Sequence, residues 1–220
     1  YEINIGDWSS DCALPISANI VIRADVVDIS KDTPRNNENF LVDTNVWYWM
    51  TYSKASLYSL AAPYQISSYP RYTQSALSAG AKLNYTGLNI LELTHVIERS
   101  EFNIVGGANT LKEFRHNHCG NRINVCAEIK SSFSQVESMG EYFEIDLGKI
   151  SISNSIGKFG SFEVDGYDCL IADYMLSSGL SNIVTDDGDF ASVAGITVFT
   201  ANRNLIQRAQ QAGKLLTRPV

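Results

Sequence analysis

Two short apolar runs in this chain end directly in acids, and this pattern restricts the folds open to the chain. Residues 40–42 lead into Asp43, and residues 182–184 lead through Thr185 into Asp187. Brief apolar, β-branched runs of this kind are typical of buried strands in parallel sheets. An acid directly after such a strand lies at the carboxyl edge of the sheet, where open α/β sheets bind their ligands.

Two further acids, Glu92 and Asp168, lie near the start of stretches with helical periodicity. If these two meet Asp43 and Asp187 at one edge, the four carboxylates repel each other strongly unless a divalent cation neutralises them. The sequence therefore predicts a metal site for Mg²⁺ or Mn²⁺, with Asp189 as a weaker candidate ligand. Any one of these acids could instead be a turn, cap or solvated helix residue, so the prediction depends on the set.

The length of 220 residues fits one domain, with short appendages, and is enough to bury a substantial core. The sequence starts at Tyr1 rather than Met, so we expect its natural beginning to lie upstream. No run of about 18 apolar residues occurs, so we expect no membrane span, and no basic segment precedes an apolar one, which argues against a secretory leader if the beginning is intact. Four cysteines without regular spacing predict reduced thiols and a cytoplasmic protein: Cys12, Cys119, Cys126 and Cys169.

The net charge of −7 argues against a protein that simply wraps a nucleic-acid backbone. Its distribution is uneven. Residues 161–189 contain acids but no Lys or Arg. In the chain after Asp189 all charged residues are basic: Arg203, Arg208, Lys214 and Arg218. An acidic centre beside a basic strip suits an enzyme that acts on a polyanion, and Arg203 is the candidate for a phosphate contact. The alternative is an acidic solvated surface and an ordinary basic terminal helix.

Periodicity and turn residues predict an α/β protein whose strands alternate with helices. This order favours a three-layer α/β/α domain with a mostly parallel sheet of about four to five strands. We expect an N-terminal extension over 1–39, with one alternating strand at 20–29 and a linker at 30–39, a core over 40–201, and a C-terminal helix or tail over 202–220. The expected helices are 46–61, 64–79 with a break at Pro70, 87–102, 111–116, 122–139, 165–176 and 202–216; Asp165 is the expected N-cap of the helix over 165–176, and Gly179 is expected to end it. The expected strands are 40–45, 82–86, 182–185 and 197–201, with a hairpin or loop at 143–155.

At these positions the chain resembles the PIN-domain ribonucleases, the family that includes VapC-type toxins. The resemblance is carried, in order, by Asp43-Thr44-Asn45, by Thr86 six residues before Glu92-Leu93, by Tyr167-Asp168-Cys169-Leu170-Ile171-Ala172, by Thr185-Asp186-Asp187-Gly188-Asp189-Phe190, and by the Gly-led strand at 193–198. It spans residues 40–201. It implies a PIN-like fold and a metal-dependent endoribonuclease.

The chain also departs from the family pattern. The Asp43–Glu92 and Glu92–Asp168 intervals are long, with an insertion over 103–160, and residues 1–39 are extra. Asp173 replaces a small residue, so a fifth acid either approaches the site or faces solvent, and Asp186 adds charge beside Asp187. These departures weaken any transfer of substrate or biological role.

Phosphodiester hydrolysis needs an activated water and neutralisation of the charge that develops on the phosphate, which one or two hard cations can provide. We expect Asp43, Asp168 and Asp187 to be ligands and Glu92 to be a ligand or to orient the water. The candidates for hydrogen bonds to these carboxylates or to a substrate phosphate are Asn45 and Thr185.

Other signals have competing explanations. His116, His118, Cys119 and Cys126 have the residue types of a zinc site but irregular spacing, so exposed loop histidines and a buried Cys126 are favoured. His95 lies one turn beyond Glu92, where a structural histidine is favoured over one that approaches the acids. The aromatics Trp47, Tyr48, Trp49 and Tyr52 could stack on bases, but core packing is favoured. Asp43 begins a motif similar to that of aspartyl phosphatases, yet a second Asp two residues on is absent.

Two classes of function therefore remain. The first is a metal-dependent ribonuclease acting on RNA, either as a toxin with a cognate antitoxin or in another role. If it is a toxin, the resemblance implies an antitoxin whose basic side chain enters the acidic site and whose apolar helix covers the aromatic first-helix region. The second is a noncatalytic PIN-like RNA-binding or scaffold protein, which has no physical need for four adjacent acids. Whether the subunits pair as a homodimer is left open.

Overall fold

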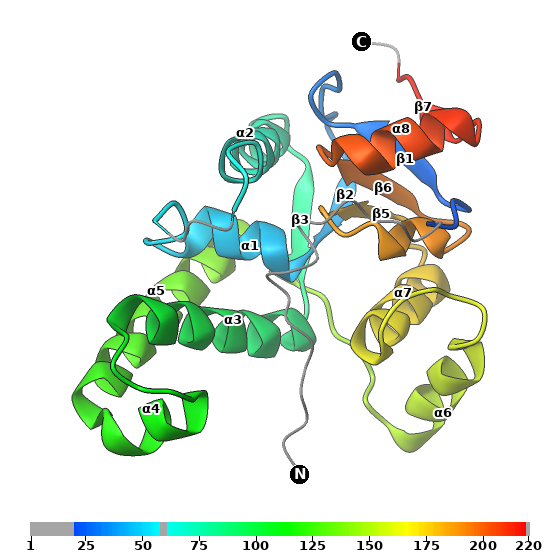
Figure 1. Cartoon of the computed structure of the whole chain (residues 1–220). Coiled ribbons are helices and arrows are strands. Elements are labelled where there is room, and N and C mark those ends of the chain that lie inside the picture. The colour runs from blue at the N-terminus through cyan, green and yellow to red at the C-terminus, as the bar shows by residue number, and fades with distance from the viewer. Residues whose placement is uncertain (1–19, 58–60, 219–220) are drawn as a thin grey trace.

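The described residues fold around a single sheet of seven parallel strands in the order β4-β3-β2-β5-β6-β1-β7 (Figure 1). This computed structural model describes residues 20–57 and 61–218. The strands are β1 (Asp25–Asp28), β2 (Asn39–Val42), β3 (Lys82–Tyr85), β4 (Glu141–Tyr142), β5 (Asn182–Val184), β6 (Thr197–Thr200) and β7 (Leu215–Leu216). The helices of the described residues are α1 (Thr44–Thr51), α2 (Gln65–Ser78), α3 (Gly87–Val105), α4 (Leu111–Asn117), α5 (Cys119–Met139), α6 (Lys149–Lys158), α7 (Gly166–Ser178) and α8 (Arg203–Gln211), with a 3₁₀ turn, η1, at Asp189–Ser192.

Alternate residues of the central strands face two separate hydrophobic cores, because side chains of a strand point in turn to opposite faces. On β2, Phe40 and Val42 face the core that contains residues of α1, α2, α3 and α5. Leu41 faces the core that contains residues of α7 and α8. The central strands are buried on both faces, so the sheet is the middle of three layers.

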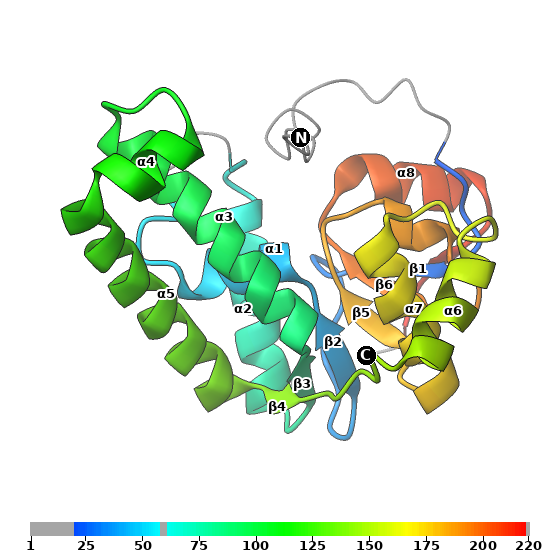
Figure 2. The ribbon, with the colours of Figure 1, turned by 90° about the horizontal axis from the view of Figure 1, so that it is seen from below.

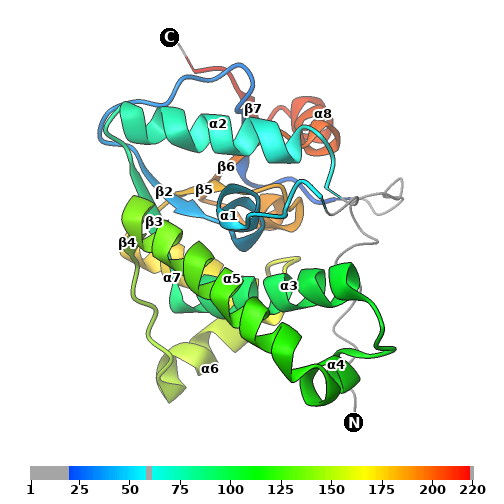
Figure 3. The ribbon, with the colours of Figure 1, turned by 90° about the vertical axis from the view of Figure 1, so that its left-hand side faces the viewer.

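The helices divide into groups that the three views show consistently. Helices α3, α4 and α5 lie together on one side of the molecule, and α6 and α7 lie together on the other (Figure 2). Helix α1 lies between α2 and the pair α3 and α5 (Figure 3). None of the helices in the two described ranges is long and apolar enough to cross a membrane.

The expected α/β class with a parallel sheet is confirmed, but the expected number of strands is wrong. The sheet has seven strands rather than about four to five. Strand β1 pairs with β6 on one side and β7 on the other, so the sheet takes strands from both flanks of the segment 40–201. Strands β4 and β7 have two residues each, too few to produce a period-2 pattern in the sequence.

Two helices near the site differ from the expected ones. Helix α1 ends at Thr51, ten residues before the expected end at residue 61. Helix α2 continues through Pro70 without the expected break. Its Tyr69, Tyr72 and other residues pack into the core, and this tertiary packing outweighs the backbone hydrogen bond that the proline removes.

Two later segments also differ. The Ile-Ser alternation near 150 is typical of a strand, yet α6 forms there. Its isoleucines are exposed, and Ser155 and Lys158 bind Asp173 of α7. The expected helix to Leu216 stops at Gln211. Gly213 takes a φ of 68° and turns the chain back, so that the last residues add β7 beside β1.

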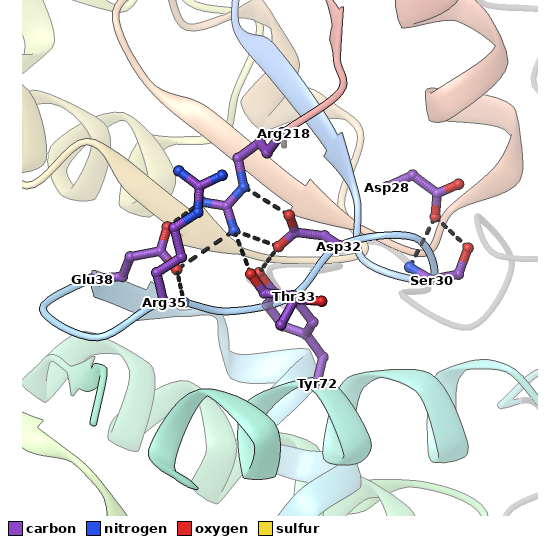
Figure 4. Close-up of polar contacts among 8 residues, drawn as sticks. All are labelled: Asp28, Ser30, Asp32, Thr33, Arg35, Glu38, Tyr72 and Arg218. Carbon is purple, nitrogen blue, oxygen red and sulfur yellow. Dashed lines mark hydrogen bonds and ion pairs between the residues drawn. The ribbon is translucent and has the colours of Figure 1, made fainter. Parts of the chain in front are cut away.

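Arg218 fastens the end of the chain to the loop before β2 (Figure 4). Its Nε donates to Asp32 Oδ1 at 2.7 Å, its Nη2 pairs with the same carboxylate, and its Nη1 pairs with Glu38. The guanidinium carbon lies 4.8 Å from the centre of the Phe199 ring. Tyr72 of α2 donates to Asp32 Oδ2 at 2.6 Å, so one buried carboxylate joins the terminus to the helical layer. This basic residue therefore has a structural role.

Replacing Arg218 with Ala should lower the free energy of unfolding by about 3 kcal/mol, because Asp32 would lose the partner of a largely buried ion pair. Urea denaturation measures this loss. The control is Lys214→Ala, whose exposed pair with Asp25 should contribute less than about 1 kcal/mol. Equal losses in the two variants would contradict the structural role.

Candidate active site

The site begins where β2 and β5 end side by side. These parallel strands pair with Val42 opposite Val184, so the next residues, Asp43 and Thr185, lie next to each other at the carboxyl edge. The Asp43 amide donates to the Val184 carbonyl at 3.0 Å. The Thr185 hydroxyl donates to Asp43 Oδ2 at 2.6 Å. The apolar runs that the sequence pattern identified are thus the strands that bring these two residues together.

Asp43 also begins the first helix. Its backbone is extended, and its Oδ1 accepts the Thr44 amide at 2.6 Å as the N-cap of α1. The residue is 7% exposed, so both carboxylate oxygens are held in a largely dry environment. A carboxylate at a helix N-terminus is stabilised by the positive end of the helix dipole.

Glu92 reaches the same place from α3. Thr86 caps this helix in a reciprocal pair with Asn89, and the geometry places Glu92 one turn beyond Asn89 on the same face. The Thr44 hydroxyl donates to Glu92 Oε2 at 2.6 Å and accepts from Asn89 Nδ2 at 3.1 Å. Thr44 therefore links the start of α1 to the acid of α3.

Asp168 enters from α7. Asp165 caps this helix by accepting the Tyr167 and Asp168 amides at 2.8 and 2.9 Å, as expected from the sequence, and Gly179 ends it with a φ of 77°. The Asp168 side chain is in the first turn and is buried. Burial raises the pKa of Asp168, and the negative charges of Asp43 and Asp187 raise it further.

Asp187 lies in the turn after β5. Its amide donates to the Thr185 hydroxyl at 2.9 Å, and its own Oδ1 accepts the Asp189 amide at 2.8 Å. Thr185 thus has the same arrangement as Thr44: each hydroxyl accepts one N–H and donates to one carboxylate. Two threonines and the backbone orient the acids that four separate elements supply.

The acids of this cluster resist ionisation. Burial, Glu92 and Asp187 raise the pKa of Asp43 to about 8, although the Thr185 hydroxyl and the Thr44 amide oppose the shift. Burial and Asp189 raise the pKa of Asp187 to about 7. Burial also raises the pKa of Asp168 and that of Glu92. Without a cation, the cluster therefore retains protons near neutral pH.

The residue types fit a hard divalent cation, but the present side-chain positions do not form a cage for one. Within residues 20–57 and 61–218, no group of three or more His, Cys, Asp or Glu side chains could hold a metal ion as it stands. Carboxylate oxygens are the ligands that Mg²⁺ and Mn²⁺ prefer. Carboxylates that share one site repel each other unless a positive charge neutralises them, so these residue types suit a cation.

Three other residues that the sequence predicts for the site are half-buried or exposed. Asn45, in the first turn of α1, is half-buried, and Arg203, the first residue of α8, is exposed at the carboxyl end of β6. Asp189 begins η1 and is exposed. All three are on the edge where the acids gather.

Two extra acids that departed from the family pattern do not join the cluster. Asp173 neither approaches the site nor faces solvent, because Lys158 and Ser155 of α6 bind its carboxylate. Asp186 points to α2, where Tyr69 and Gln65 donate to its two oxygens at 2.6 Å each. The lone sequence could not show that each acid has partners on another helix, α6 for Asp173 and α2 for Asp186.

Further alternatives are decided by packing. Trp47 is fully buried, Tyr48 and Tyr52 stack on each other at 5.1 Å in the core, and the partly buried Trp49 packs on Tyr69 at 5.3 Å, so the expected packing against the core is confirmed. Burial and Arg99 lower the pKa of the half-buried His95 on α3, and its Nε2 has no hydrogen-bond partner among the described residues, so the expected structural role stays a prediction. Cys126 is exposed, so its expected burial is wrong; it is on the solvent side of α5.

Sequence reasoning missed Thr44, Asn89 and Asp165 as parts of the site. Asn89 was identifiable, because it precedes Glu92 by three residues on a predicted helix and so shares its face. Thr44 had no comparable signal, since the partner of its hydroxyl is 48 residues away.

Comparisons with known proteins leave the function open. No protein-family model matches the sequence, and no curated protein matches it. A solved structure, "Crystal structure of PAE2754 from Pyrobaculum aerophilum", is 18% identical over 84% of this chain and 97% of that chain, with a TM-score of 0.41. At that score the likeness carries no argument about fold or function.

The raised pKa values predict how the cation-free protein responds to pH. Asp43 and Asp187 have pKa values of about 8 and about 7 when folded, against an ordinary 3.8, so the folded state holds extra protons between these limits. The free energy of unfolding should therefore fall as pH rises from about 5 to about 8. In Asp43→Asn the slope should be shallower, because one of the carboxyls with a raised pKa is removed.

Urea denaturation in the presence of EDTA measures this slope. Thr33→Ala, which leaves the cluster unchanged, is the control and should keep the wild-type slope. A wild-type stability that rises over this range would contradict the assigned protonation.

Proposed function

We propose that this protein is a metal-dependent endoribonuclease of the PIN-like α/β/α type. The observation that carries the proposal is the convergence of Asp43, Glu92, Asp168 and Asp187, from four different elements, at the carboxyl edge of a parallel sheet. A protein that uses this edge only as a scaffold gains nothing from burying carboxyls that repel one another. This favours catalysis over the noncatalytic alternative.

A bound Mg²⁺ or Mn²⁺ would neutralise the charge that develops on the phosphate and lower the pKa of a bound water. Asp43, Asp168 and Asp187 are the residues that would hold the cation. Glu92, whose Oε2 accepts the Thr44 hydroxyl, is a ligand or orients the attacking water through its other oxygen. Thr44 and Thr185 keep two carboxylates in place, and proton loss from the cluster would accompany cation binding.

Asn45 and Arg203 are placed to contact the substrate. Asn45 makes no side-chain hydrogen bond within the described chain and lies two residues after Asp43. Arg203 follows Asn202, whose side-chain amide donates to the Asp186 carbonyl at 2.9 Å, so α8 begins beside the Asp187 turn. A cation there would offset the repulsion between the acids and an RNA backbone.

The role of toxin needs a different antitoxin contact from the one expected. Trp47 and Tyr48 of α1 are buried and Trp49 is partly buried against the core, so these aromatics leave little surface for an antitoxin helix. We propose RNA as the substrate and the cytoplasm as the location; an antitoxin could reach the acidic edge itself, where a basic side chain would occupy the place of the cation.

Replacing Asp43 or Asp168 with Asn should lower the cleavage of single-stranded RNA in Mn²⁺ more than about 100-fold, beyond the loss typical of residues that merely support metal ligands. Gel analysis of an RNA panel measures the rates. Asp173→Asn, on the same helix as Asp168 but bound to α6, is the control and should keep most activity. Wild-type rates in both site variants would contradict the proposal.

Replacing Arg203 with Ala should weaken RNA binding and lower the salt dependence by about one phosphate contact, a slope change of about 0.7 for a single strand. The measurement uses an Asp43→Asn background, which cannot cleave. Arg208→Ala, in the last turn of the same helix, is the matched control and should keep the slope. An unchanged slope for Arg203→Ala would contradict the phosphate contact and show that the C-terminal cations belong to an ordinary basic helix.

A further inference from the structure

Asp186 is a buried acid beside the candidate site that the proposed chemistry does not use. It is 8% exposed, and its carboxylate accepts three hydrogen bonds from the first half of α2. The donors are the Tyr69 hydroxyl at 2.6 Å, Gln65 Nε2 at 2.6 Å and the Tyr64 hydroxyl at 3.1 Å. Burial of a carboxylate is costly unless such donors compensate for the lost water. These hydrogen bonds therefore fix the turn after β5 to α2, a helix that packs on one face of the sheet.

The Tyr69 hydroxyl is the centre of this arrangement. It donates its proton to Asp186, accepts the Ala201 amide at 3.0 Å, and lies 3.0 Å from the Thr200 hydroxyl. Ala201 and Thr200 are at the end of β6. One fully buried phenol thus joins α2 to the ends of two neighbouring strands, β5 and β6.

The backbone of the turn is held from a second direction. Asn202, the N-cap of α8, donates to the Asp186 carbonyl at 2.9 Å. With its side chain and its carbonyl both bound, Asp186 has little freedom to rotate. The next residue, Asp187, is the acid of the cluster, and its amide is bound to Thr185. The position of the Asp187 carboxylate therefore depends on how Asp186 is held.

Helix α2 contains a near-duplicate of this contact that is remote from the site. Tyr72, one turn beyond Tyr69, is also buried, and its hydroxyl also donates to an aspartate at 2.6 Å. That aspartate is Asp32, which pairs with Arg218 in the loop before β2 (Figure 4). The two tyrosines share helix, burial and bond type, and differ in whether the acceptor adjoins the acid cluster.

We propose that Tyr69 is a positioning residue that acts through Asp186 to hold the Asp187 turn at the carboxyl edge, ready to bind the cation. This inference rests on the proposed function for the part that concerns cation binding. Helix α2 then has a second task besides covering the sheet: it fixes the geometry of one ligand. The hydroxyl touches neither substrate nor cation.

The test compares Tyr69→Phe with Tyr72→Phe, each of which removes one hydroxyl and keeps the ring. Urea denaturation measures stability, and both variants should lose a similar amount. Amide hydrogen exchange in the cation-free protein measures the turn directly. In Tyr69→Phe the Asp187 and Asp189 amides should exchange about tenfold faster, the factor for loss of one hydrogen bond to a charged group. In Tyr72→Phe they should exchange at the wild-type rate after correction for stability.

Calorimetric titration with Mn²⁺ supplies the second readout. Affinity should fall about 10-fold or more in Tyr69→Phe, as is typical when a residue that supports a metal ligand is lost, and should stay unchanged in Tyr72→Phe. Equal effects of the two variants on exchange at the turn would overturn the inference and show a general stabilising role. If wild-type protein neither binds Mn²⁺ nor cleaves RNA, the proposed function fails, and the exchange comparison alone still decides whether Tyr69 holds the turn.

Discussion

The parallel pairing of β2 with β5 is the contact on which the site depends. Its register sets Val42 opposite Val184, and the chain leaves both strands at one edge with Asp43 beside Thr185. A shift of one residue would turn the apolar side chains of β2 to the wrong faces, so the two hydrophobic cores enforce the register that aligns the acid with the threonine. The fold thus fixes the first contact of the site before any ligand is involved.

The other acids are added to this contact at the starts of helices. Asp43 caps α1, Glu92 lies one turn into α3, and Asp168 is in the first turn of α7. Helix N-termini suit this task because they accept negative charge. Burial, together with neighbouring acids, still raises the pKa of Asp43 and of Asp187, so ionising these carboxyls at the edge is costly. Local packing stabilises the protein elsewhere. At the carboxyl edge, where function is expected, the acid cluster costs stability instead.

The sequence predicted the parts of this arrangement that depend on local pattern. The runs before Asp43 and Asp187 are buried strands, Asp165 is the cap of α7, and the parallel α/β class is correct. The errors have a common cause, which is that the deciding partner is distant in the chain. Helix α2 tolerates Pro70 because of its contacts with the core.

Partners on other elements also determine which acids join the cluster. Asp186 and Asp173 are acids of the same local kind as Asp187 and Asp168, but α2 binds the first and α6 binds the second. The roles of Thr44 and Tyr69 follow from contacts across 48 and 117 residues, which no periodicity records. The short strands β4 and β7 are defined by their neighbours on the sheet rather than by their own residues.

The central claim is that the converging carboxyls are a cation site. Anomalous diffraction from crystals soaked in Mn²⁺ tests it most directly, because the signal locates the ion without reference to activity. The account predicts a peak at the carboxyl edge between β2 and β5, within coordination distance of Asp43, Asp168 and Asp187. A map with no peak there, or with Mn²⁺ only at surface acids elsewhere, would contradict it.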